Sequence, residues 1–245
     1  MPSTRYDLKL TGPDDGTIFI GLQLLLPMDR VRHVGEAVAM VVAETLPQAL
    51  DAAEAVEIEY EELPWVASSK SALSLGAPAV WDEVSDNVLV DTMFGDKAAT
   101  DRAFAGADHV VAVDLHIGRV TGVPIEPRAA LGHYDMGTDR YTLYAGSGGA
   151  VRQKAERAAV LGISPERLRV LSYDVGGNFG ARNRLYVEFG LVLWAARKLG
   201  RPVKYTATRS EAFLSDFQGR DLVIKVALAL QSDDCFSGIA RRQCQ

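Results

Sequence analysis

Two glycine-rich segments are the parts of this sequence best suited to bind a ligand. Gly146-Ser-Gly-Gly149 and Gly176-Gly-Asn-Phe-Gly180 each lie between an expected strand and an expected helix. Glycine allows a positive φ angle and lets backbone amides approach an anion, and the start of the following helix favours negative charge. This chemistry suits a phosphate, a pyrophosphate or a pterin phosphate. For either loop taken alone, a tight turn that binds nothing is the stronger alternative.

The first loop partly matches the dinucleotide-binding fingerprint. Gly146, Gly148 and Val151 follow its spacing, and Asp174 closes the next expected strand, where a ribose-binding acid belongs. The third glycine is missing, however, and the spacing to Asp174 is long. An NAD-dependent dehydrogenase that uses the turn from Gly146 to Val151 is therefore one alternative interpretation. A P-loop is excluded, because no Gly-Lys-Ser or Gly-Lys-Thr occurs.

The second loop presents backbone amides and one apolar ring, Phe179, together. That combination suits a flat polar cofactor or substrate that approaches the backbone closely. The spacing alone does not name the ligand.

Composition and charge exclude several classes of protein. Hydrophobic residues make up 48% of the chain and charged residues 24%, as in ordinary globular proteins. The net charge of −6 argues against a nucleic-acid partner. Two cysteines, Cys235 and Cys244, exclude a disulfide framework, an iron–sulfur cluster and a cysteine zinc site within these residues. We expect a cytoplasmic protein, because we find neither a signal peptide nor an apolar run long enough to span a membrane.

His109, Asp114 and His116 lie close together in the sequence, but we do not expect them to bind a metal ion. On a strand, Asp114 and His116 share one face while His109 lies on the other. No third ligand lies near them in the sequence.

The N-terminal region has the pattern of a small α/β unit. Residues 37–43 form a continuous apolar run that predicts a buried strand. Thr45 and Gln48 form a capping box that predicts a helix over 46–55. Apolar residues and glutamates alternate over 56–61, which predicts a second strand.

Strands and helices alternate in the rest of the chain. Helices are expected over 150–161 and 186–199, since Gly162 and Gly200 provide stop signals. The expected strands are 110–117, 131–134, 141–145, 168–173, 203–207 and 222–230. The apolar residues expected to form the buried stripe of helix 150–161 are Val151, Ala155, Ala158 and Ala159.

Several segments, taken in order, carry a resemblance to one known family. They are Val34-Gly-Glu-Ala-Val-Ala39, 52–64, Val123-Pro-Ile-Glu-Pro-Arg-Ala-Ala130, Asp174-Val-Gly-Gly-Asn-Phe-Gly180, 193–203 and 209–216. They resemble the large subunits of molybdenum hydroxylases, the family of xanthine dehydrogenase, aldehyde oxidoreductase and aerobic carbon monoxide dehydrogenase. The resemblance implies an oxidoreductase that hydroxylates aldehydes or N-heterocycles or oxidises CO. It also implies an α/β (α+β) fold, with a small hammerhead-type module followed by part of a mixed α/β molybdopterin-binding domain.

The resemblance sets the expected domain organisation. Residues 1–66 are expected to form a partial hammerhead-like module, 67–90 a linker and 91–230 a partial molybdopterin-binding domain, while 231–245 form a tail without resemblance. Family members are far longer, and their general-base glutamate lies near their C-terminus. We therefore expect a fragment that is inactive alone, with a non-catalytic assembly fragment as the other alternative. Without a partner, the strand at 222–230 would expose an apolar edge.

The resemblance also assigns site residues. In the family, the second glycine loop lies against the molybdenum centre and its phenylalanine borders the substrate pocket. The residues expected on the cofactor side are Gly148, Gly149, Gly176, Gly177, Asn178, Phe179 and Gly180. Asn178 stands where the family has a glycine. Many family members place a glutamine at the position of Gly148, so any contact here must come from the amide. No catalytic residue and no metal ligand of this chain is assigned.

The expected substrate pocket contains Phe179, Glu126, Arg128 and Arg182. For Glu126 and Arg128, an ion pair or a structural arginine is the alternative to a role in the pocket. Arg182 and Asn183 can equally brace the loop.

The cofactor implied by the resemblance is molybdopterin, as the cytosine dinucleotide or a similar form. FAD and [2Fe–2S] clusters are expected only on partner subunits of the same complex. The full-length subunit is expected to homodimerise, with no nucleic-acid partner and no membrane span.

Overall fold

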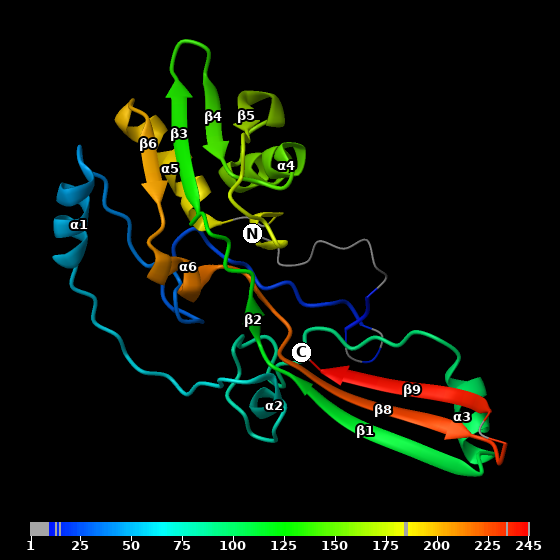
Figure 1. The fold of residues 1–245 in the computed structure, drawn as a ribbon. Helices are drawn as coiled ribbons and strands as arrows, with labels where there is room; N and C mark the ends of the chain where they lie inside the picture. Colours follow the sequence, from blue (N-terminus) through cyan, green and yellow to red (C-terminus); the bar gives the residue numbers. More distant parts are fainter. Residues whose placement is uncertain (1–9, 13, 15, 184–185, 234, 245) are drawn as a thin grey trace. The chain divides into compact units, whose positions relative to one another are not determined.

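The computed structural model describes residues 10–12, 14, 16–183, 186–233 and 235–244 (Figure 1). The chain divides into two compact units, which are described separately. The first unit contains Leu22–Glu61 and Thr121–Gln218. The second unit contains the described residues of Pro2–Gly21, Glu62–Val120 and Gly219–Gln245.

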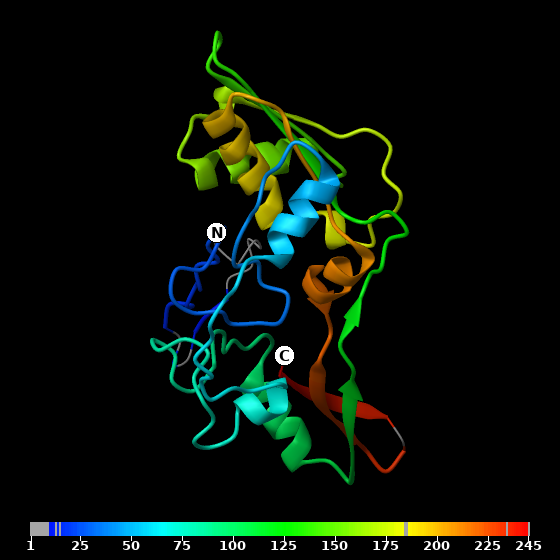
Figure 2. The same cartoon turned by 90° about the vertical axis from the view of Figure 1, so that its left-hand side faces the viewer.

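A four-stranded mixed sheet forms the centre of the first unit. Its strand order is β5-β4-β3-β6, with β3 antiparallel to both β4 and β6 and with β4 parallel to β5. Helices α4 and α5 cover one face of this sheet (Figures 1 and 2). The bounds are β3 (Ala129–Asp135), β4 (Arg140–Ala145), α4 (Ala150–Leu161), β5 (Leu168–Leu171), α5 (Val187–Leu199) and β6 (Val203–Thr206). These bounds confirm the strands and helices predicted between residues 131 and 207 to within two or three residues.

Close packing between β3 and α5 holds the core of the first unit together. Alternate residues of β4, such as Leu143, are fully buried beneath α5, where Leu193 is also fully buried. Gly132 of β3 lies against the backbone of α5, and a Cβ at this position would be 2.6 Å from the carbonyl oxygen of Val192. Only glycine therefore allows the helix to lie this close to the strand.

The bounds predicted for α4 are confirmed, but Ala158 is the one residue of the predicted buried stripe that is buried. Val151 is 85% exposed, and the buried residues of this helix are Gln153, Arg157 and Ala158. The long polar side chains of Gln153 and Arg157 have interaction partners within the first unit. Gln153 donates to the carbonyl of Arg182, and the Arg157 guanidinium lies 4.7 Å from the centre of the Phe189 ring. Hydrogen bonding and the cation–π contact offset the cost of burying these polar groups.

In the N-terminal part of the first unit, the predicted helix is present and the two predicted strands are absent. Helix α1 (Leu46–Glu54) begins with the predicted capping box of Thr45 and Gln48. Residues 37–43 and 56–61 form no strand, since no described segment pairs with either of them. A strand pattern needs a neighbouring strand to complete its hydrogen bonds. Residues 56–61 are consequently exposed, including the apolar side chains expected to be buried.

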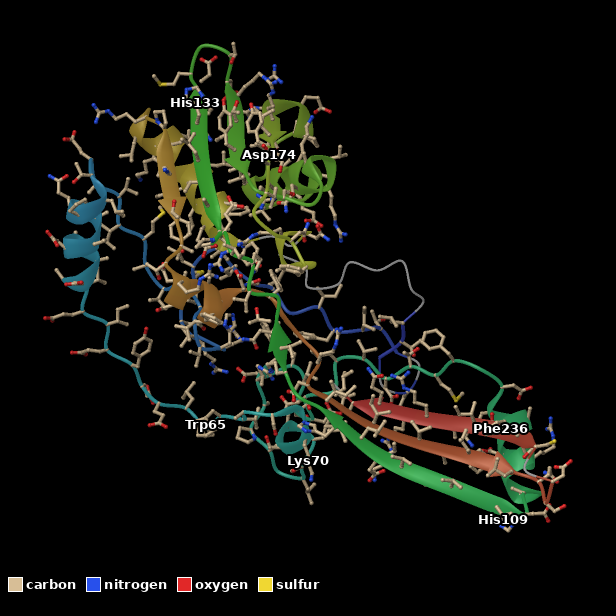
Figure 3. All side chains as sticks on the ribbon, viewed as in Figure 1. Trp65, Lys70, His109, His133, Asp174 and Phe236 are labelled. Carbon is tan, nitrogen blue, oxygen red and sulfur yellow. The ribbon has the colours of Figure 1, made fainter. Side chains whose placement is uncertain are left out.

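The second unit contains a three-stranded antiparallel sheet with the order β1-β8-β9. The predicted strands at 110–117 and 222–230 are confirmed as β1 and β8. The edge of β8 that would be open without a partner is covered, because β9 pairs with Val223 to Leu230. His109 and Phe236 lie at the same end of this sheet (Figure 3). The bounds are α2 (Ser69–Ala72), α3 (Lys97–Ala105), β1 (His109–Ile117), β8 (Leu222–Leu230) and β9 (Phe236–Cys244).

The remaining elements are short. Strand β2 (Val120–Thr121) pairs with β7 (Gln218–Gly219). The others are α6 (Arg209–Ser215) and the 3-10 turns η2 (Pro165–Arg167) and η3 (Ala181–Asn183). Within the described residues, no helix is both long enough and apolar enough to cross a membrane.

Candidate functional site

Both glycine loops belong to the first unit and lie at the same edge of its sheet. The first loop connects β4 to α4, and the second follows β5. Since β4 and β5 are parallel, the loops after their carboxyl ends are neighbours, which is where open α/β sheets bind ligands. The amide of Gly148 in the first loop reaches the carbonyl of Arg182, just after the second loop, at 3.5 Å.

Glu126 fixes the start of the second loop through two hydrogen bonds to Gly176. The Glu126 amide donates to the Gly176 carbonyl at 3.2 Å, and the Gly176 amide donates to Glu126 Oε2 at 2.6 Å. A Cβ on Gly176 would lie 2.6 Å from the Cβ of Glu126, so only glycine fits. The side chain of Glu126 therefore acts on the backbone of the loop.

The middle of the second loop presents an exposed ring and backbone amides. Phe179 is 75% exposed and has a φ of +49°, a left-handed conformation that is unusual for an aromatic residue. Gly177 and Gly180 also have positive φ, +118° and +87°. The amides of Gly177 and Phe179 donate to no acceptor among the described residues. The loop thus offers two N–H donors and an aromatic face to a ligand, at the cost of one strained residue.

Arg182 lies beneath the loop as a brace. Its side chain is buried, donates to the carbonyl of Glu126 and lies 3.6 Å from Asp216. Its own carbonyl accepts hydrogen bonds from the amide of Gly148 and from Gln153 Nε2. Of the two alternatives for Arg182, the structure shows the bracing contacts.

Arg128 is the centre of a buried ion cluster. Its fully buried guanidinium donates to Glu188 and to Ser215 Oγ, both at 2.7 Å, and to Asp216. It also lies 4.4 Å from the centre of the Tyr186 ring. Arg128 therefore makes the contacts of a structural arginine, with Glu188 and Asp216 as its ion-pair partners.

The cluster shifts the pKa values of its members. Burial alone would lower the pKa of Arg128, but the charges of Glu188 and Asp216 and their hydrogen bonds outweigh burial and raise it. Burial, followed by the negative charge of Asp216, raises the pKa of Tyr186 to about 12. Both groups therefore keep their protons across the physiological range.

Sequence reasoning missed the residues that support the loops. Gln153, Glu188 and Asp216 come from three different helices or helix ends. Asp216 ends the segment 209–216 that carries the resemblance, but nothing in that segment connects it with the loops. The sequence offered one general indication of such partners, because an arginine that is buried needs acidic side chains beside it. That signal does not say which acids of the chain supply them.

A shallow hollow of about 260 Å³ borders the first loop. Its lining includes Gly146, Asp174 and Lys204, together with apolar residues of β3 and β4. Asp174 lies beyond the end of β5, near β4 (Figure 3). The hollow is open to solvent and contains one acidic and one basic side chain.

Histidine, cysteine and acidic side chains form no group of three suited to a metal ion within the described part of the chain. His109 and His116 are far apart along β1, opposite Leu230 and Val223 of β8.

Comparison with known families decides the assignment. A family model of the molybdopterin cofactor-binding domain matches residues 80–243. The chain belongs to this family. A second model, the a/b hammerhead domain of aldehyde oxidase and xanthine dehydrogenase, matches residues 4–64. The two matches confirm the resemblance and the fold class, and the first includes residues 231–243, for which the sequence showed no resemblance.

Relatives of this chain include large subunits of enzymes in the molybdenum hydroxylase family. Subunit gamma of the 6-hydroxypseudooxynicotine dehydrogenase complex of Paenarthrobacter nicotinovorans is 33% identical, with 88% of this chain and 27% of that protein covered. The carbon monoxide dehydrogenase large chain of Hydrogenophaga pseudoflava is 30% identical, with 88% and 28% covered. The crystal structure of quinoline 2-oxidoreductase from Pseudomonas putida 86 superimposes with a TM-score of 0.86 at 31% identity, covering 96% of this chain and 29% of that one. The chain spans about a quarter of the length of these relatives.

Proposed function

We propose that this chain provides the cofactor-facing loops of a molybdenum hydroxylase large subunit that oxidises an aldehyde, an N-heterocycle or CO. A bound molybdenum pterin would supply the redox-active metal for that oxidation. The chain's own residues would hold the pterin and present the substrate side of the site. The observation that carries the proposal is the second loop, where the amides of Gly177 and Phe179 lack an acceptor among the described residues beside an exposed ring.

The residues fit such a group, and each loop has a part in holding it. In the second loop, Gly176, Gly177, Asn178, Phe179 and Gly180 would line the pterin, and the amides of Gly177 and Phe179 would donate to it. In the first loop, Gly148 and Gly149 precede the 12-residue helix α4, whose N-terminus has no side-chain cap. Such an uncapped N-terminus favours the phosphate of the cofactor, which we propose to be a cytosine dinucleotide or a similar form.

Phe179 would form the substrate side of the site. Its ring is exposed on the loop that approaches the cofactor, so a flat or small apolar substrate would contact it. Glu126, Arg128 and Arg182 would shape this pocket from below, since their contacts act on the loop backbone and on the ion cluster. In this arrangement the second loop would bind cofactor and substrate, and the three charged residues would support the loop.

The complex around this chain is also part of the proposal. We propose that partner subunits carry FAD and [2Fe–2S] clusters, that the full-length subunit homodimerises, and that the enzyme is cytoplasmic. The relatives support partner subunits, because one is named as a subunit of a dehydrogenase complex and another as a large chain. Since the chain spans about a quarter of these relatives, it would bind the cofactor weakly and have no activity alone.

The test is a titration of the purified chain with molybdopterin cofactor, measuring bound pterin by fluorescence after equilibrium dialysis. We expect saturable binding with one pterin per chain. Gly180→Ala should weaken it by about tenfold or more, because alanine at a positive φ disturbs the loop. Gly76→Ala is the matched control, since Gly76 has a φ of +78° against +87° for Gly180 and neither has an atom within 4 Å of a Cβ.

Two outcomes would contradict the proposal. One is the absence of saturable binding, and the other is an equal effect of the two substitutions. Inactivity is tested separately by elemental analysis and a hydroxylation assay of the purified chain. Stoichiometric molybdenum together with turnover would overturn that part.

A further inference from the structure

Gly148 is the point where the two glycine loops meet. A Cβ on Gly148 would overlap Asn183 Oδ1 and Asn178 Nδ2, and it would lie 2.9 Å from Asn183 Cγ. The backbone of Gly148 does not need glycine, because its φ is not positive. The neighbouring Gly149 has no atom within 4 Å of the same hypothetical position. The side chains of Asn178 and Asn183, and not the turn itself, therefore occupy the space that a side chain at 148 would need.

The carboxamide of Asn178 is oriented by two hydrogen bonds. Its Oδ1 accepts the Gly180 amide proton at 2.9 Å, which turns its Nδ2 toward Asn183 Oδ1 at 3.1 Å. One side chain thus fixes the backbone of its own loop and also holds the residue at the end of η3. A carboxamide nitrogen carries two N–H groups, and the second one of Asn178 has no acceptor among the described residues.

We propose that Asn178 and Asn183 form a clasp over Gly148 that joins the two glycine loops into one cradle, with Asn178 as its positioning residue. The term clasp refers to these two side chains and the hydrogen bond between them. Its role in cofactor binding rests on the proposed function, whereas the clasp itself is a property of the chain alone. Glycine at 148 and asparagine at 178 are then complementary, because the carboxamides occupy the space that a side chain at 148 would need.

A neutral carboxamide suits this place better than a carboxylate. A phosphate or another anionic group held between the loops would meet the amides of Gly177 and Phe179 and the second N–H of the Asn178 carboxamide. The substitution Asn178→Asp would retain the acceptor for the Gly180 amide, but the new carboxylate would lack the donor and repel an anion. This variant therefore separates the acceptor function of the Asn178 side chain, toward the Gly180 amide, from its donor function, toward Asn183 and an anion.

The test is hydrogen exchange measured by mass spectrometry on the full chain without any cofactor. Asn178→Ala should raise exchange in peptides covering 146–149 and 176–183 by about fivefold, the effect of losing one neutral hydrogen bond. Asn178→Asp should raise exchange at 146–149 to the same extent and leave the Gly180 amide protected. Gly148→Ala should resemble Asn178→Ala, and Gly149→Ala, the matched control, should leave exchange unchanged.

A double substitution makes the test decisive. If the clasp exists, Gly148→Ala has already displaced the carboxamides, so adding Asn178→Ala should change exchange by less than about twofold. Fully additive effects would overturn the proposal, as would a Gly148→Ala chain that exchanges like Gly149→Ala. Because no cofactor is present, a failure of the clasp is distinguishable from a failure of cofactor binding.

Discussion

Glu126 and Gly176 hold each other through a pair of hydrogen bonds, one in each direction, although 50 residues separate them in the sequence. The carboxylate accepts the glycine amide at 2.6 Å, and the glycine carbonyl accepts the glutamate amide at 3.2 Å. This pair anchors the start of the loop that presents Phe179. The order of the loop therefore depends on a residue outside it.

Glu126→Ala should loosen the second loop without unfolding the chain. It removes a charge-assisted hydrogen bond at an exposed site, a loss of about 1–2 kcal/mol. Hydrogen exchange at Gly176 should increase by about tenfold, with the fold of α4 and α5 retained. Glu126→Gln keeps an acceptor oxygen and should recover most of the protection. Equal exchange in the glutamine and alanine variants would show that the acceptor has no role.

Arg128→Met should destabilise the first unit strongly. It leaves Glu188 and Asp216 in a buried site without their main cation, and breaking a buried ion pair costs about 3–5 kcal/mol. The free energy of unfolding in urea measures this loss. The control is Arg201→Ala, which removes an ion pair with Glu44 at an exposed site of the same unit and should cost less than about 1 kcal/mol. A loss for Arg128→Met that is no larger than the control would contradict the buried cluster.

Tyr186 should make the stability fall between pH 10 and pH 12. Burial and the charge of Asp216 raise its pKa to about 12 from 10.0, so the folded chain keeps this proton after the unfolded chain has lost it. The contribution of Tyr186 to the free energy of unfolding is complete below pH 10 and is lost as the pH rises to 12. The total loss is about 2–3 kcal/mol.

Urea unfolding at several alkaline pH values checks this dependence against Tyr186→Phe. The phenylalanine variant lacks the titrating group, so its stability should fall less over the same range. Parallel curves for the two chains would contradict the assignment of the shift to Tyr186.

Gly132→Ala should lower the melting temperature because its methyl group meets backbone that cannot move aside. The three nearest atoms belong to the backbone of Val192 and Leu193 in α5, at 2.6 to 2.9 Å. Overpacking of this kind costs about 1–3 kcal/mol. Gly146→Ala is the control in the same sheet region, since the nearest atom to its Cβ would be 3.6 Å away. Similar melting temperatures for the two variants would show that α5 does not pack as described.

The sequence predicted those elements whose signals are local. Helices α4 and α5 end at Gly162 and Gly200, both of which adopt the left-handed conformation expected of such stop residues. Residues 37–43 and 56–61 have strand patterns, but a strand also needs a partner, which a local pattern cannot supply. Strand β9 was not predicted, because Arg241 and Arg242 interrupt its apolar pattern. It has a partner strand, β8, and pairing with β8 determines its conformation.

The two glycine loops were visible in the sequence, whereas the partners of Arg128 and Gln153 were not. Glycine loops are visible in a sequence, because positive φ and close backbone approach favour one residue type. Asp216 binds Arg128 across 88 residues, and no spacing rule connects such a pair. The buried polar face of α4 was missed for the same reason, since the partner of Gln153 is the carbonyl of Arg182.

The most direct test of the central claim follows the backbone amides of Gly177 and Phe179 by ¹H–¹⁵N NMR during titration with molybdopterin cofactor. We predict that both amide signals shift with one common saturation curve, together with signals from the first loop. Binding of the cofactor with these two signals unchanged, while signals elsewhere in the chain move, would contradict the proposed role of the second loop.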